Sequence, residues 1–398
     1  MIKIEHEVLD NIEADLLPWL REHAAEPEAL RRLPDETAAK LRDSGVMRLI
    51  QPARCGGYEA DPQVFYEAVR LIGTACGSSA WVTGVVGVHS YQVGLYDQRA
   101  QDEVYGDDPD TWISSHYQPH GVLTPVEGGY RLSGHWHFSS GSDHCNWVFV
   151  GARIGADTSE DEVDLQNWYH VLVPRPDYRV DDVWDVVGLA GTGSNDIIIE
   201  DAFVPEHRVL AWMDLVQQNC PGREINTGPL FRMPWTALFG SAVAAPMVGM
   251  GYGALEHYVR SQQPKPGADG ERSRPVMGDW VILRGVAEAS SELHAARELL
   301  LGNLVEMYEY ACADEPIPQE LRQRCRRDQI MAGVLSLRAT DTVFEHAGGR
   351  ALGRKNALQR MWRDAHGARA HVVNSPNMSL AAYATGLLGG VNYDLMGS

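Results

Sequence analysis

A short polar segment between two tryptophans carries the clearest chemical signal in the chain. It runs from Trp136 to Trp147 and reads Trp-His-Phe-Ser-Ser-Gly-Ser-Asp-His-Cys-Asn-Trp. The hydroxyls of Ser139 and Ser140 can hydrogen-bond the nitrogens of a flat heteroaromatic ring, and Gly141 lets the backbone approach such a ring closely. The same composition is equally typical of a polar strand end. The segment therefore indicates either a ring-binding edge or an ordinary turn.

Two histidines at the start of this region raise the question of a metal site. His135 and His137 are two residues apart, so on a strand they share one face and could ligate an ion. Two imidazoles without a third ligand do not make a site. We therefore expect a solvated polar face and no bound metal.

Motifs of other enzyme classes are missing from the sequence. Gly249, Gly251 and Gly253 lack the G-x-G-x-x-G spacing and lie in a helical pattern, where small residues let helices pack closely. The chain has no G-x-S-x-G elbow and no H-E-x-x-H pair. These observations argue against a Rossmann nucleotide site, an α/β-hydrolase and a zinc protease.

The spacing of apolar residues, which predicts the helices and strands that position the polar segment, changes twice along the chain. Residues 1–110 carry helical repeats such as Phe65, Val69 and Ile72. From about residue 111 the period becomes two, as in the alternation that begins at Tyr130. The further strands that we expect are 148–152, 169–173 and 197–204. After Pro221 the helical period returns. The sequence predicts an α+β, mainly α fold with an N-terminal helical domain (1–110), a central β-barrel or sandwich (111–218) and a C-terminal helical bundle (219–398).

The composition of the chain indicates which binding partners to exclude and in which cellular compartment to expect the protein. The 34 Lys+Arg against 54 Asp+Glu give a net charge of −20, which repels nucleic acids and anionic membranes. The six cysteines are scattered without a C-x-x-C pair, so we expect neither a disulfide framework nor a zinc ribbon, and a cytoplasmic location. The chain opens without a secretory signal pattern, and its longest apolar stretch, 242–255, is shorter than the ~18 residues of a membrane span.

The chain as a whole resembles the acyl-CoA dehydrogenase fold, whose C-terminal part is a four-helix bundle. The segment from Gly188 through Phe203-Val204-Pro205 is similar to that family's middle-domain strand, and Gly56-Gly57 is similar to its early glycine pair. One difference sets the subclass. Where those dehydrogenases carry a catalytic glutamate, residues 362–376 carry histidines, as in the oxygenase components of two-component flavin monooxygenases. Segments 31–35, 51–54, 65–69, 182–188 and 287–291 resemble members that hydroxylate a phenolic secosteroid.

The resemblance implies a cofactor, a partner and a reaction. Reduced FMN or FAD would arrive as a diffusible co-substrate from an NADH-dependent flavin reductase and react with O2 to form a C4a-hydroperoxyflavin. This species would hydroxylate a small aromatic substrate ortho to its phenol group. The family also implies a homotetramer assembled through the C-terminal helices.

The resemblance also assigns roles to individual residues. Ser140 would hydrogen-bond flavin N5, and His371 would assist proton delivery near the oxygen adduct, with His366 as its rival. His89 and Ser115 would face the phenol, since a base at its hydroxyl, with a pKa near ~10, raises the electron density of the ring. Further flavin contacts would come from Trp81, Tyr117, Ser139, Gly141, Gly348 and Gly349, and a basic residue at the phosphate from Lys265, Arg272 or Arg274.

Several alternatives stay open at this point. His89 could be a satisfied histidine in an apolar helix, and His371 a cation at a helix end. The same fold could oxygenate the nitrogen of an amino sugar or oxidise an acyl-CoA thioester. The chain could also be a catalytically idle helical scaffold.

Overall fold

The structure is a computed structural model that describes residues 4–155, 164–263, 279–392 and 394–397. The α-helices are α1 (Glu7–Asn11), α2 (Leu17–His23), α3 (Glu26–Leu30), α4 (Asp35–Asp43), α5 (Pro62–Ala75), α6 (Gly77–Val93), α7 (Gln98–Tyr105), α8 (Trp212–Gln217), α9 (Trp235–Gln262), α10 (Trp280–Cys312), α11 (Gln319–Ala347), α12 (Ala357–Arg369) and α13 (Pro376–Leu387). The strands are β1 (Ile113–Val126), β2 (Gly129–Ser139), β3 (Trp147–Ile154), β4 (Tyr169–Pro174), β5 (Arg179–Asp181), β6 (Asn195–Pro205) and β7 (Val209–Ala211). The predicted order of helices, strands and helices is confirmed.

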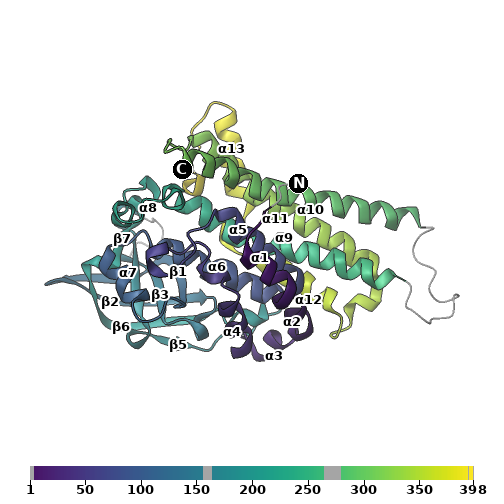
Figure 1. The fold of residues 1–398 in the computed structure, drawn as a ribbon, viewed down its shortest axis with the longest axis horizontal. Helices are drawn as coiled ribbons and strands as arrows, with labels where there is room; N and C mark the ends of the chain where they lie inside the picture. Colours follow the sequence, from purple (N-terminus) through teal and green to yellow (C-terminus); the bar gives the residue numbers. More distant parts are fainter. Residues whose placement is uncertain (1–3, 156–163, 264–278, 393, 398) are drawn as a thin grey trace.

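Helix α6 is the central element of the fold. Every residue from Gly77 to Val93 is buried, because the helix is apolar or small on all sides and is covered on all sides. Figure 1 shows it between the sheet and the C-terminal helices, and it packs against both β1 and α9. Trp81 and His89 therefore lie between the two halves of the molecule.

The strands form one seven-stranded sheet in the order β5-β6-β2-β1-β3-β4-β7. Strand β2 pairs antiparallel with both β1 and β6, so the polar segment lies at the end of a central strand. The β2–β6 register shifts between Trp136 and Ser139, and Phe138 there has a left-handed φ of 61°. This irregularity turns the chain just before Ser140.

Helix α9 forms the core of the C-terminal half. Among the described residues it alone is long and apolar enough to cross a membrane, but 89% of its most apolar window is buried inside the protein. Helix α9 is therefore buried like a core helix of the protein. The predicted packing role of its glycines is confirmed. A Cβ built on Gly249 would lie 2.8 Å from Cα of Gly73 and 2.3 Å from the carbonyl oxygen of Arg70 on α5.

A matched pair of glycine variants tests this close approach. Gly249→Ala should lower the free energy of unfolding by about 2 kcal/mol, because the new methyl overlaps the backbone of α5. Gly302→Ala on α10 meets nothing within 4 Å and should stabilise the helix by up to ~1 kcal/mol. Urea unfolding of both variants measures the difference. Equal stabilities would contradict the packing argument.

Candidate functional site

Trp81 contacts both Ser140 and His371, two residues assigned to the flavin from distant parts of the chain. Its indole Nε1 donates to Oγ of Ser140 over 3.1 Å. Its ring also meets the imidazole of His371 edge to face, with centroids 5.5 Å apart. The serine at the end of β2 and the histidine after α12 therefore lie around one tryptophan of α6.

A chain of hydroxyls orients Ser140. The Thr192 hydroxyl donates to the carbonyl of Leu189 over 2.9 Å, so its oxygen accepts from Ser194 over 2.7 Å. Ser194 in turn accepts from Ser140 over 2.7 Å. Since the proton of Ser140 is directed to Ser194 and one lone pair meets Trp81, one lone pair of its Oγ is left to accept from an N–H donor. The sequence analysis missed Ser194 and Thr192, although their hydroxyls stand out in the Gly-Thr-Gly-Ser motif.

The residues around Ser140 suit a flat polar ring. The buried Oγ of Ser139 has no hydrogen-bond partner in the described part of the chain. Gly141 has φ 72°, and a Cβ there would press against Val82 and Val86 at 3.1 and 3.0 Å. Phe138 is 65% exposed and held in a rare backbone conformation, which is typical of functional positions. This edge fits the isoalloxazine ring of a flavin. Phe138, which the sequence analysis did not single out, would border such a ring.

His371 is a neutral donor in this arrangement. Its Nδ1 accepts from the backbone N–H of Val373 over 3.2 Å, so the proton of the neutral ring is on Nε2. Burial, and to a smaller extent the charge of Arg326, lowers the pKa of His371 to about 4. His366 instead lies 2.9 Å from Oδ1 of Asp341 on α11. The contact with Trp81 thus belongs to His371 and not to its rival.

His89 has the opposite tautomer. Its Nδ1 lies 2.5 Å from the carbonyl oxygen of Ile113 and must donate to it, which leaves Nε2 as an unprotonated acceptor. This Nε2 is buried and has no partner among the described residues. Burial lowers the pKa of His89 to about 4. A buried acceptor without a donor requires an explanation, and the hydroxyl of a bound molecule provides one.

Tyr117 connects His89 with Ser115 in an aromatic cluster. Its ring lies 5.9 Å from that of His89 and stacks on that of His170 at 4.4 Å. Burial raises the pKa of the Tyr117 hydroxyl well above its usual value, against hydrogen bonds to Ser115 and Gln92 that lower it. Gln92 and His170 were missed in the sequence. Both lie in apolar runs, and only the fold brings them to Tyr117.

The buried neutral histidines predict an acid-sensitive fold. Burial lowers the pKa of His89 to about 4 and that of His170 to about 3, against ~6.5 in the unfolded chain. Below pH ~6.5 the unfolded state therefore binds more protons, and the free energy of unfolding falls by up to ~1.4 kcal/mol per pH unit for each histidine until pH ~4. Urea unfolding at pH 7, 6 and 5 measures the slope. His170→Gln should reduce it, and an unchanged slope would exclude His170 as a cause.

The contacts predicted for the flavin phosphate involve two glycines and a basic residue. Gly348 and Gly349 are exposed at the end of α11, and a Cβ on either would meet nothing within 4 Å. Lys265, Arg272 and Arg274 lie outside the described residues. The phosphate contacts therefore stay a prediction.

The reason for excluding a metal at His135 and His137 was wrong. Both imidazoles contact Asp196 on the neighbouring strand β6, which is a third potential ligand. The sequence could not reveal it, because 59 residues separate Asp196 from His137.

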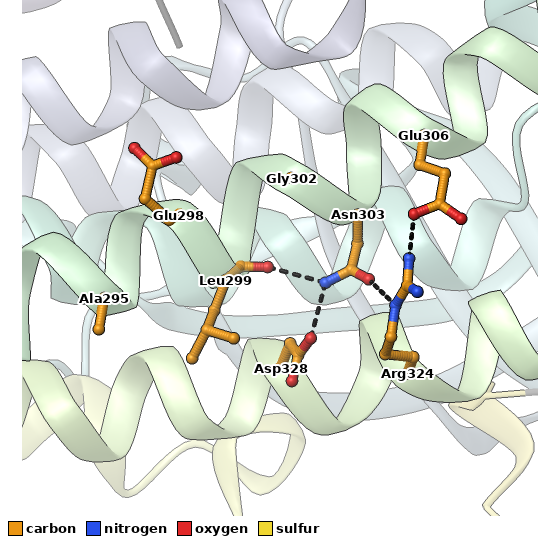
Figure 2. A pocket seen from close by; sticks show the side chains of 8 residues that line it. All are labelled: Ala295, Glu298, Leu299, Gly302, Asn303, Glu306, Arg324 and Asp328. Carbon is orange, nitrogen blue, oxygen red and sulfur yellow. Dashed lines mark hydrogen bonds and ion pairs between the residues drawn. The ribbon is translucent and has the colours of Figure 1, made fainter. Parts of the chain in front are cut away.

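A separate cavity lies elsewhere in the described part of the chain. It has about 510 Å³ between α10 and α11 (Figure 2). Asn303 donates to Asp328 over 2.9 Å and accepts from Arg324 over 2.7 Å, and Figure 2 shows these side chains pointing toward one another. The lining is Ala295, Glu298, Leu299, Gly302, Asn303, Glu306, Arg324 and Asp328. Its walls hold three carboxylates, an amide, a guanidinium and aliphatic groups, and none of the lining side chains is aromatic, so the cavity does not suit an aromatic ligand.

Known proteins resemble this chain over almost its whole length. Residues 241–376 match the family described as acyl-CoA dehydrogenase, C-terminal domain. The flavin-dependent monooxygenase, oxygenase subunit HsaA, of Rhodococcus jostii is 44% identical over 94% of this chain and 96% of its own. The crystal structure of 3-HSA hydroxylase from Rhodococcus has a TM-score of 0.92 at 44% identity, covering 98% and 99% of the two chains. XiaF from Streptomyces, in complex with FADH2 and glycerol, has a TM-score of 0.86 at 26% identity, covering 97% and 96%.

The chain has the acyl-CoA dehydrogenase-like fold. Among proteins of this fold, the chain belongs to the family of flavin-dependent monooxygenases, as an oxygenase subunit. It is therefore an enzyme that uses reduced flavin and O2, and the term oxygenase subunit implies a separate reductase component. An acyl-CoA dehydrogenase, an N-oxygenase and an idle scaffold are not favoured.

Proposed function

We propose that this enzyme hydroxylates a phenol ortho to its hydroxyl group, with reduced FMN or FAD supplied by an NADH-dependent reductase. The observation that carries the proposal is the free acceptor on His89, a buried Nε2 beside Tyr117 and Phe149. Aromatic walls with one neutral base suit a phenol ring and its hydroxyl proton. The bulky phenol of the secosteroid type is the substrate class that the similarity to 3-HSA hydroxylase supports.

We expect one group of residues to bind the phenol and another to bind the flavin in the same site. His89 would accept the hydrogen bond of the phenol hydroxyl, with Ser115 as the second polar group there. Ser140 would accept from the N–H of reduced flavin N5, while Phe138 and Trp81 border the ring. His371 would hold a proton on Nε2 for transfer beside the ring. Bound reduced flavin supplies the two electrons that activate dioxygen, and one oxygen atom enters the substrate while the other leaves as water.

A direct assay tests the reaction. The purified chain receives chemically reduced FMN or FAD, O2 and a series of phenols, and catechol formation is followed by chromatography. We expect catechol without any reductase, and no oxidation of NADH by the chain alone. Peroxide as the only product with every phenol would contradict the proposal. The rates of catechol formation with FMN and with FAD show which flavin the enzyme prefers.

His371→Ala should shift the consumption of reduced flavin from catechol to hydrogen peroxide. The variant loses the neutral donor that contacts Trp81. His366→Ala is the matched control, since His366 pairs with Asp341, and it should keep the wild-type yield. A peroxidase-linked assay measures peroxide per flavin. Unchanged coupling in His371→Ala would refute the role.

A cytoplasmic homotetramer is the form in which we expect the enzyme to act. The exposed apolar side chains of the C-terminal region support further association, since such patches mark protein interfaces. They are Leu352, Met378, Leu387 and Leu388. Gly348 and Gly349 would then reach the flavin of a neighbouring subunit. Light scattering after gel filtration tests the mass, and all six free cysteines agree with a reducing compartment.

A further inference from the structure

His135 and His137 share one carboxylate oxygen across two strands. Nε2 of His135 lies 2.7 Å from Oδ2 of Asp196, and Nδ1 of His137 lies 2.8 Å from the same oxygen. The three potential ligand atoms lie within 4.8 Å of one another. Both imidazoles project from β2 and the carboxylate from β6, so the strand pairing itself creates the group.

We propose that these three side chains bind one divalent transition-metal ion, such as Zn²⁺. Two imidazoles and a carboxylate suit zinc and its neighbours, whereas Mg²⁺ and Ca²⁺ prefer a shell of oxygens. In a tetrahedral zinc site with bonds of ~2.0–2.1 Å, the ligand atoms lie about 3.4 Å apart. Each imidazole nitrogen, now 2.7 or 2.8 Å from Oδ2, therefore has to withdraw from it by about 0.6–0.7 Å to admit the ion.

Burial and charge support this movement. The two histidine side chains are 50% exposed and can rotate, while the aspartate side chain is 9% exposed and held by the sheet. The open side gives water access to the fourth ligand position. The net charge of −20 also raises the local concentration of cations.

The ion would act as a cross-link within the sheet. The β2–β6 register is irregular between Trp136 and Ser139, next to His137. A metal held by both strands would join them there, beside the residues that we assign to the flavin. Since it binds the folded site and not the dispersed ligands of the unfolded chain, it should raise the thermal midpoint.

Calorimetric titration of the chelator-treated full chain with ZnCl2 tests the site. We expect one tight ion per chain, and at least tenfold weaker binding in both His135→Ala and Asp196→Asn. His294→Ala removes an exposed imidazole from α10 and should bind as the wild type does. Wild-type affinity in His135→Ala, or absence of binding in the wild type, would overturn the proposal. His135→Ala decides the question if the buried Asp196→Asn variant fails to fold.

Two further readouts separate this site from adventitious binding. Co²⁺ should give the intense visible absorption of a four-coordinate ion with the wild type and with His294→Ala, but not with His135→Ala. Zn²⁺ should raise the thermal midpoint of the same two proteins only. Equal effects on all three would place the ion elsewhere.

Discussion

Replacing His89 with alanine is expected to lower kcat/KM for a phenol by about 100-fold or more, because a positioned proton acceptor contributes ~10²–10⁴-fold. The bond from Nδ1 to Ile113 fixes the tautomer, so Nε2 can only accept. Without it, the hydroxyl of the phenol, whose pKa lies near ~10, loses the acceptor that orients it and draws its proton away from the ring. The ring then has less electron density for reaction with an electrophilic oxygen.

The pH profile distinguishes this role from a structural one. In His89→Ala, the deficit in kcat/KM should be largest at neutral pH, where the phenol needs an acceptor, and should shrink toward pH ~10, where the substrate ionises by itself. His89→Gln keeps an acceptor oxygen and should recover part of the activity. His294→Ala controls for the loss of any histidine. A uniform loss at every pH, without recovery by glutamine, would mean that His89 only supports the fold.

The sequence predicted what depends on local pattern. The strand that begins near Tyr130 and the helix around Phe65 follow directly from their periods of two and 3.6 residues. The segment with Ser139 and Ser140 was visible because hydroxyls and glycine stand side by side. These features need only neighbours in the chain.

Features that depend on strand pairing could not be predicted. Ser194 reaches Ser140 because β6 pairs with β2, and Asp196 reaches His137 for the same reason. The left-handed Phe138 results from the register shift, which no single-sequence pattern encodes. The residues missed in the sequence therefore lie mostly on a partner element that arrives from far along the chain.

His89 and His371, the two candidate catalytic histidines, are both neutral because of burial, but they carry their ring proton on different nitrogens. Burial lowers the pKa of both His89 and His371 to about 4, so neither is charged at pH 7. Their Nδ1 partners differ: a carbonyl faces His89 and a backbone N–H faces His371. One ring thus becomes a hydrogen-bond acceptor and the other a hydrogen-bond donor, which suits an acceptor facing the hydroxyl of a phenol and a donor beside a flavin.

Ser140→Ala should raise the ratio of hydrogen peroxide to catechol about tenfold, because a hydrogen bond of ~1–1.5 kcal/mol to the flavin N–H corresponds to about that factor. The variant removes the lone pair that the Ser194 and Trp81 contacts leave free. Ser194→Ala keeps the Oγ of Ser140, but the proton of that hydroxyl no longer has a fixed acceptor. We therefore expect a smaller rise in the ratio of peroxide to catechol.

Ser142→Ala is the matched control for Ser140→Ala, since the Ser142 hydroxyl donates to the Gly193 carbonyl over 3.2 Å and lies in the same segment. It should leave the ratio of peroxide to catechol near that of the wild type. Single-turnover mixing of reduced flavin with oxygenated enzyme and phenol gives both products in one experiment. If Ser140→Ala couples as well as Ser142→Ala does, the hydroxyl chain serves only to hold β2 against β6, and protection of the reduced flavin must come from the aromatic residues around it.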